Sequence, residues 1–149
     1  MKKIFLFLSV VSLTMLFSCS DDDGGSASNK ILKAKINNVE KTFSVISKTE
    51  ETYTEDGYTW TDVKITAKQA DDATKFIEFI IEKGITGAEA SWYFAYNEGE
   101  KIYEKTASFT TEVTESNNSG VKGTFSGTLQ DTSSDDVLTI TDGMFDIKY

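Results

Sequence analysis

The sequence predicts an all-β domain of about eight antiparallel strands, and three observations support this prediction. From residue 30 onward, Thr, Val, Ile and aromatic residues alternate with Lys, Glu and Ser. Turn residues such as Asn37-Asn38 recur between these segments. Within Val121–Leu129, small and large residues alternate on one face. These features fit a lipocalin-like up-and-down barrel or an immunoglobulin-like two-layer sandwich. The sequence pattern does not choose between the two architectures.

The first two strands are expected to form a hairpin. Leu32–Ile36 and Val39–Ser47 each alternate apolar and polar residues, and Asn37-Asn38 between them is a typical hairpin turn. In the second strand, Phe43 and Val45 share one face. We therefore expect both side chains to enter the core.

A third strand is expected over Tyr58–Lys68. Tyr58 and Trp60 have the opposite parity from the apolar residues that follow them in the same strand. Either the two rings face outward, or a bulge near Thr61-Asp62 returns them to the core.

The later strands follow the same pattern. Phe76–Glu82 is apolar on both faces, which predicts a strand covered on both sides. The parity of the last strand shifts at Asp142-Gly143, which predicts a bulge or bend. Strands are expected at residues 76–82, 88–96, 102–114, 121–129 and 137–149.

The N-terminus has the pattern of a bacterial lipoprotein signal. Lys2 and Lys3 precede the apolar run Ile4–Phe17, which is shorter than the ~20 residues needed to span a bilayer. The small residue Ser18 then precedes Cys19, the only cysteine. We expect residues 1–18 to be cleaved and Cys19 to carry the lipids that attach the protein to a membrane.

An acidic tether, residues 19–29, separates Cys19 from a single domain at residues 30–149. Asp21–Asp23 resembles the acidic export signal of surface lipoproteins in Bacteroidota-type bacteria. This resemblance predicts an outer-membrane protein that faces the cell surface. The alternative is a solvated spacer on the periplasmic side.

Composition excludes several classes of function. The formal net charge is −9, and loss of Lys2 and Lys3 makes the mature chain more acidic, so we expect no binding to nucleic acid. The chain has no histidine, and lipidation would occupy its one cysteine. Histidine-based triads and the usual zinc sites are therefore excluded. We expect no cofactor and no enzymatic activity.

Exposed aromatic residues are the best candidates for a binding site, because a flat ring can stack on a sugar or anchor a protein contact. Tyr58 with Trp60, and Trp92 with Tyr93, qualify by strand parity. They predict a face that binds a glycan or an envelope protein. The alternative is that both tryptophans fill the core.

Acidic residues suggest two further functions, and both are weaker. Asp131, Asp135 and Asp136, or Asp71-Asp72, could bind calcium, but their spacing is typical of turn caps, so we expect no metal. Glu78 and Glu82 would lie about 13 Å apart on one strand, too far for a glycosidase pair. A hydrolase would need a carboxylate from another strand. A structural accessory subunit of an envelope complex is the other alternative.

The C-terminal strands, residues 123–129 and 138–147, resemble the ending of a family of small Bacteroidota-type lipoproteins, a domain family of unknown function. The resemblance extends more weakly to Leu32–Asn37 and to Ile85-Thr86-Gly87. It implies a single β-domain on a lipid tether. It implies no catalytic residues.

Overall fold

The computed structural model describes residues 30–149, and it is all-β as predicted. Cys19, the leader and the tether lie outside the described residues. The domain contains ten strands and one short 3-10 turn, η1 (Ala88–Ala90). The strands are β1 (Lys30–Ile36), β2 (Val39–Phe43), β3 (Val45–Glu55), β4 (Tyr58–Lys68), β5 (Lys75–Glu82), β6 (Ser91–Glu98), β7 (Lys101–Lys105), β8 (Thr110–Asn117), β9 (Gly120–Asp131) and β10 (Val137–Lys148).

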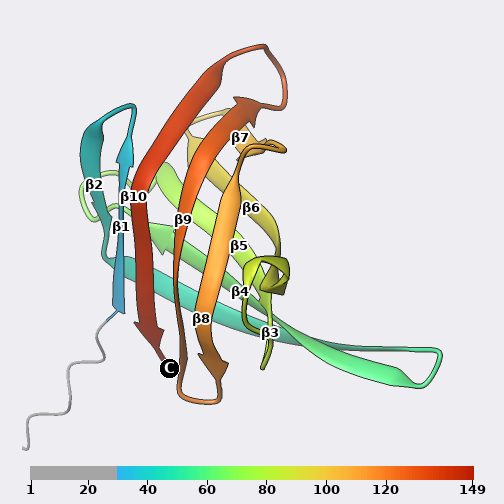
Figure 1. Cartoon of the computed structure of the whole chain (residues 1–149). Helices are drawn as coiled ribbons and strands as arrows, with labels where there is room; N and C mark the ends of the chain where they lie inside the picture. Colours follow the sequence, from blue (N-terminus) through green and yellow to red (C-terminus); the bar gives the residue numbers. More distant parts are fainter. Residues whose placement is uncertain (1–29) are drawn as a thin grey trace, which may run out of the picture.

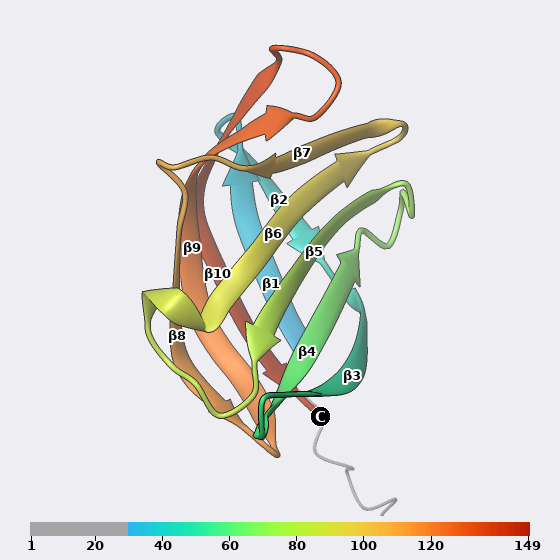
Figure 2. The ribbon, with the colours of Figure 1, turned by 90° about the vertical axis from the view of Figure 1, so that its right-hand side faces the viewer.

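All ten strands belong to one antiparallel sheet. The strand order is β2-β1-β10-β9-β7-β6-β5-β4-β3. The first half of β9 pairs with β8, and its last residues pair with β7. The sheet curls into a half-barrel, so that β3–β7 face β1, β2, β9 and β10 (Figures 1 and 2).

The core fills the inside of this curl. Aromatic rings from the two facing halves meet there: the ring centroids of Phe79 and Phe145 lie 5.0 Å apart, and those of Phe94 and Phe125 lie 4.9 Å apart. Phe109 packs on Phe94 at 4.5 Å. Burial of these rings is the main source of stability in a domain that has no disulfide.

The predicted first hairpin is confirmed, but its second strand ends early. Asn37 and Asn38 have φ of 48° and 65°, as a two-residue hairpin turn requires. The expectation of one strand over Val39–Ser47 is wrong, because the strand breaks at Ser44. The break reverses the parity, so Phe43 is buried and Val45 is exposed.

A second predicted strand, residues 102–114, is also divided. Between β7 and β8 the chain turns, and the Phe109 N–H donates to the Thr106 carbonyl at 3.0 Å. The turn moves the chain from beside the end of β9 to beside its beginning. No glycine, proline or asparagine marks this turn in residues 106–111, so the segment is compatible with a continuous strand.

The strand count exceeds the expected eight for these two reasons. The break at Ser44 separates β2 from β3, whose polar residues had not been predicted as a strand. β3 and β4 extend past the rest of the sheet as a projecting arm (Figure 1). Because both faces of the arm contact solvent, the strand lacks the alternation that marks half-buried strands.

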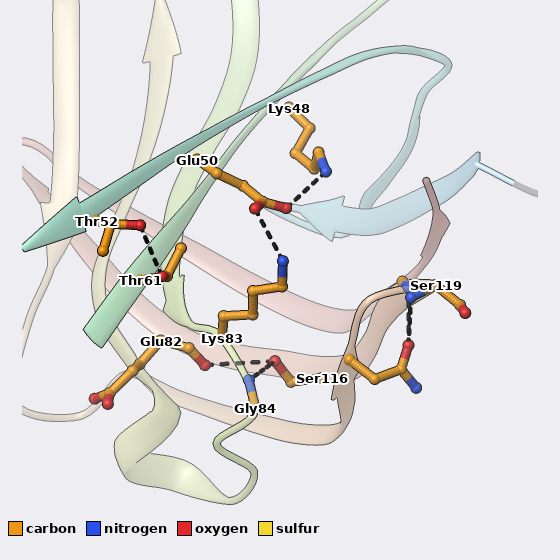
Figure 3. A network of polar contacts seen from close by, with 11 residues as sticks. Lys48, Glu50, Thr52, Thr61, Glu82, Lys83, Gly84, Ser116 and Ser119 are labelled. Atoms are coloured by element: carbon orange, nitrogen blue, oxygen red, sulfur yellow. Dashed lines mark hydrogen bonds and ion pairs between the residues drawn. The ribbon is translucent and has the colours of Figure 1, made fainter. Parts of the chain in front are cut away.

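The predicted irregularity in the last strand is confirmed. The register between β9 and β10 shifts between Ile140 and Gly143, and Asp142 has φ of 52°. The Ser116 hydroxyl accepts the Gly84 N–H at 2.9 Å and so ties the loop after β5 to β8 (Figure 3). Within residues 30–149, no helix is long and apolar enough to cross a membrane.

Candidate functional site

The outward-facing side of β3–β6 carries the predicted aromatic residues, and we call this surface the outer face. Pairing of β3 with β4 runs without a shift from Val45 opposite Lys68 to Glu55 opposite Tyr58. A bulge near Thr61-Asp62 is therefore excluded. Tyr58 and Trp60 point outward, which was the other alternative.

Three aromatic rings form a row on the arm, which we call the aromatic row: Tyr53, Tyr58 and Trp60. The Trp60 ring stacks with Tyr53 at a centroid distance of 5.6 Å and with Tyr58 at 5.7 Å. Tyr58 is 62% exposed and Tyr53 is 40% exposed, so the row is open to solvent. Offset stacking of this kind holds the rings in fixed positions.

Trp92 reaches the outer face through a bulge. Ile80 pairs with Tyr93 and Ile81 pairs with Ser91, so Trp92 is the extra residue of β6. Trp92, Phe94 and Tyr96 have the same parity in the sequence, but the bulge places Trp92 on the opposite face from the other two. Phe94 and Tyr96 are buried, whereas Trp92 is 55% exposed.

Tyr93 is less accessible than Tyr58 and Trp92. It lies half-buried opposite Ile80, and its ring is 6.2 Å from that of Trp92. Burial raises the pKa of its hydroxyl above the usual value. Neither Trp60 nor Trp92 belongs to the core. The alternative that both tryptophans are core residues is therefore wrong.

The expectation that β5 is covered on both sides is also wrong. Its inward residues, such as Ile77 and Phe79, are fully buried, but Phe76 and Ile80 on the outer face are only half-buried. Side chains of neighbouring strands shield them in place of a second layer. Ile80 thus supplies apolar surface to the outer face.

Carboxylates lie next to the aromatic row. Glu51 pairs with Asp62, and Asp62 pairs with Glu82, so three acidic residues cross β3, β4 and β5 side by side. We call them the carboxylate row. Like charges directly opposite each other destabilise a sheet. Their side-by-side placement therefore needs an explanation.

Tyrosine hydroxyls compensate the two outer members of the carboxylate row. The Tyr58 hydroxyl donates to Glu82 Oε1 at 3.0 Å, and the Tyr53 hydroxyl donates to Glu51. Each of these hydrogen bonds raises the pKa of the tyrosine, because the carboxylate stabilises the neutral hydroxyl. The aromatic and carboxylate rows thus support each other.

Asp62, the central member, differs from the other two. It is only 8% exposed, and its Oδ1 has no hydrogen-bond partner. A buried carboxylate oxygen without a donor costs free energy and is rare in folded proteins. The hydrogen-bonding capacity of Asp62 is therefore available to a ligand.

An open hollow of about 190 Å³ joins these groups. Asp62 lines it together with Glu51, Tyr53 and Ile80, and Trp92 lines its other side. Trp92 and Tyr53, a member of the aromatic row, thus line the same hollow. A second hollow, of about 410 Å³, lies beyond Trp92 and is lined by Glu89 and Lys105.

The sequence pattern does not mark Tyr53 or Asp62 as site residues. Tyr53 lies on the part of β3 that had not been predicted as a strand. A hairpin centred on Asp56-Gly57 would have placed Tyr53 opposite Trp60. No sequence signal marks Asp62 as buried, because its burial depends on the neighbouring strands.

Three of the other acidic candidates, Asp72, Asp131 and Asp136, have partners within the fold. Asp131 Oδ1 accepts the Ser133 N–H at 3.1 Å, and Asp72 Oδ1 accepts the Thr74 N–H at 3.0 Å, as turn caps do. Asp136 pairs with Lys101. Within residues 30–149, no cluster of three or more potential ligands is arranged to hold a metal ion.

Glu78, the first member of the pair Glu78 and Glu82, likewise has partners other than Glu82. Glu78 Oε1 lies 2.9 Å from Lys64 Nζ, and its Oε2 accepts the Thr66 hydroxyl at 3.3 Å. Asp62, and not Glu78, is the carboxylate opposite Glu82.

Comparison of the chain with family models, curated proteins and solved structures finds no match. The outer face is therefore interpreted from its own geometry.

Proposed function

We propose that this chain is an outer-membrane lipoprotein whose β-domain binds a glycan through the outer face and performs no chemistry. The observation that carries the proposal is the hollow lined by Asp62 between exposed Trp92 and the aromatic row. Aromatic faces stack on the apolar face of a sugar ring, and carboxylates accept its hydroxyl groups. A site with both kinds of group can therefore hold a sugar ring and bind its hydroxyl groups.

A glycan array read together with tryptophan fluorescence tests this proposal. We expect binding of at least one glycan class, with a change in the emission of the exposed tryptophan. Trp92→Ala should weaken binding about tenfold or more, as expected for loss of a central aromatic contact. Ile102→Ala, at an exposed apolar residue of β7, is the matched control. An array without binding and an unchanged emission would reject the glycan.

The membrane anchor is proposed from the sequence around Cys19. The Cys19→Ser variant should not yield membrane-bound protein of mature size, because Cys19 would carry the lipids that supply the membrane affinity. Proteinase treatment of intact cells should degrade the domain if it faces the cell surface. Protection until the outer membrane is broken would place it on the periplasmic side.

A protein-binding role as an accessory subunit is the second candidate, and the free edge of β3 favours it. β3 is the last strand of the sheet and pairs only with β4. An unpaired strand can accept a strand from a partner. Slower hydrogen exchange of the β3 amides in the presence of outer-membrane extract would favour this role, whereas unchanged exchange would favour the glycan.

A hydrolase is the remaining alternative, because Asp62 lies opposite Glu82. Cross-strand neighbours can reach the separation of about 5 Å that retaining glycosidases use. The proposal of a non-catalytic domain predicts that bound glycans stay intact. Release of new reducing ends, lost in both Asp62→Asn and Glu82→Gln, would assign an enzyme instead.

A further inference from the structure

We propose that the outer face recognises a protonated amine, so that its ligand is an amino sugar with a free amino group. This inference rests on the proposed glycan-binding function and specifies the chemistry of the glycan. It starts from Asp62, the one carboxylate that lines the hollow with a buried, unpartnered oxygen. A ligand that donates hydrogen bonds would complete this site.

The charges around Asp62 favour a cationic donor over a neutral hydroxyl. Glu51 and Glu82 flank Asp62 on both sides. Among residues 30–149, no lysine forms an ion pair with any of these three carboxylates. A hydroxyl would satisfy a hydrogen bond but leave the negative charge uncompensated. An ammonium group would do both.

Lys64 is the nearest competitor for this role, since it also lines the hollow. Its Nζ lies 2.9 Å from Glu78 Oε1, so its charge is already paired with a carboxylate outside the row. Lys64 therefore contributes its hydrocarbon chain to the wall of the hollow. The charge of Asp62 is left for the ligand.

The aromatic residues favour the same kind of ligand. Tryptophan and tyrosine faces attract cations, and the effect is strongest for tryptophan. Trp92 and Tyr53 line the hollow on either side of Asp62, so an ammonium group there would contact aromatic surface as well as the carboxylate. The sugar ring that carries the amine would cover the exposed ring of Trp92.

A matched pair of oligosaccharides tests the inference: the β-1,4-linked glucosamine tetramer and its fully N-acetylated form. Calorimetry at pH 5 keeps the amines protonated, although the oxygens of the sugar lower their pKa well below that of a lysine side chain. We expect the glucosamine tetramer to bind about tenfold more tightly or better than the acetylated form. Raising the pH to 9 should reduce this difference, since the amines become neutral.

Variants separate the amine contact from the ring contact. Asp62→Asn should remove the preference for the amine, whereas Trp92→Ala should weaken binding of both tetramers. Glu40→Gln, on β2 at the other end of the sheet order, is the matched control for a lost acidic residue and should change neither affinity. The preference should persist in 0.3 M salt, which screens nonspecific attraction to an acidic protein.

The outcomes distinguish this inference from the proposed function. Equal or tighter binding of the acetylated tetramer, or a preference that survives in Asp62→Asn, would overturn the amine and leave glycan binding intact. A tetralysine peptide that binds as tightly as the glucosamine tetramer would overturn the sugar and assign the face to basic peptides. Absence of binding by both tetramers, together with an empty glycan array, would overturn both proposals.

Discussion

The ring of Phe125 fills the space that a β-carbon at Gly143 would need. A β-carbon built on Gly143 would lie 2.5 Å from Cδ2 and Cε2 of Phe125, and 2.4 Å from its carbonyl oxygen. Non-bonded carbon atoms do not approach so closely. The glycine thus lets the core ring lie across β10 at its bulge.

The Gly143→Ala variant should therefore lose stability. We expect a decrease of about 2 kcal/mol or more in the free energy of unfolding, because the ring or the strand must move to admit the methyl group. Urea denaturation measures the decrease. Thr139→Ala, at an exposed position of the same strand, is the control and should cost much less. Equal effects of the two variants would show that β10 adapts to the methyl group freely.

The correctly predicted strands have one face in the core and one face exposed to solvent. Asn37-Asn38 and Gly143 were located because a hairpin turn and a parity shift each leave a local signal. The arm gave no such signal, since both of its faces are solvated. The turn between β7 and β8 could not be predicted from local residues. Its place depends on the pairing with β9, because β7 pairs with the end of β9 and β8 pairs with its first half.

The candidate site was predicted in part for a related reason. Parity left an outward position as one of two alternatives for Tyr58 and Trp60, and the unshifted pairing of β3 with β4 decides for it. The exposure of Trp92 depends on a bulge opposite Ile80-Ile81. Asp62 became a candidate only through its cross-strand neighbours, Glu51 and Glu82. Such relationships depend on strand register, which a single sequence does not specify.

The buried hydroxyl of Tyr96 predicts loss of stability at alkaline pH. Burial raises the pKa of Tyr96 above its usual value near 10. Above about pH 10 the unfolded chain therefore releases a proton that the native protein retains, so the stability falls as the pH rises. The slope from this one group approaches about 1.4 kcal/mol per pH unit.

The Tyr96→Phe variant should reduce this loss while it keeps the contacts of the ring with Phe43 and Tyr103. Urea denaturation at pH 8, 10 and 11.5 provides the comparison. The curves of the two proteins should diverge only above pH 10. Parallel curves over the whole range would assign the alkaline loss to other groups.

A cluster of three charges on the inner side of the arm predicts a contribution that depends on salt and on acid. Glu50 lies 2.7 Å from Lys48 Nζ and 2.9 Å from Lys83 Nζ (Figure 3). Hydrogen bonds from the two lysines hold the pKa of Glu50 below its usual range. The stabilisation is present at neutral pH and is lost as the pH falls through this lowered pKa.

The Glu50→Gln variant should therefore lose about 0.5 kcal/mol at pH 7, a typical value for a partly exposed ion pair. The difference should shrink in 0.5 M salt and disappear near pH 2, and urea denaturation follows both changes. Glu55→Gln, near the tip of the same arm, is the control and should have no effect. A constant difference at all pH values would indicate lost packing and not lost charge.

We expect the Asp62→Asn substitution to lower the affinity for the ligand and to raise the free energy of unfolding. Asp62→Asn removes a buried charge that has no donor and that lies between Glu51 and Glu82. The amide group can donate to these carboxylates, so we expect the free energy of unfolding to rise by about 1 kcal/mol. Thermal and urea denaturation measure the change, with Glu40→Gln as the control.

This combination separates a binding residue from a structural one. If Asp62 served the fold, its neutral variant would lose stability, and any loss of ligand affinity would follow from a damaged arm. A variant that gains stability and loses the ligand shows instead that the charge is maintained at a cost to the fold. Residues of this kind are expected where function conflicts with stability. A decrease in stability would mean that Asp62 has a role in the folded arm itself.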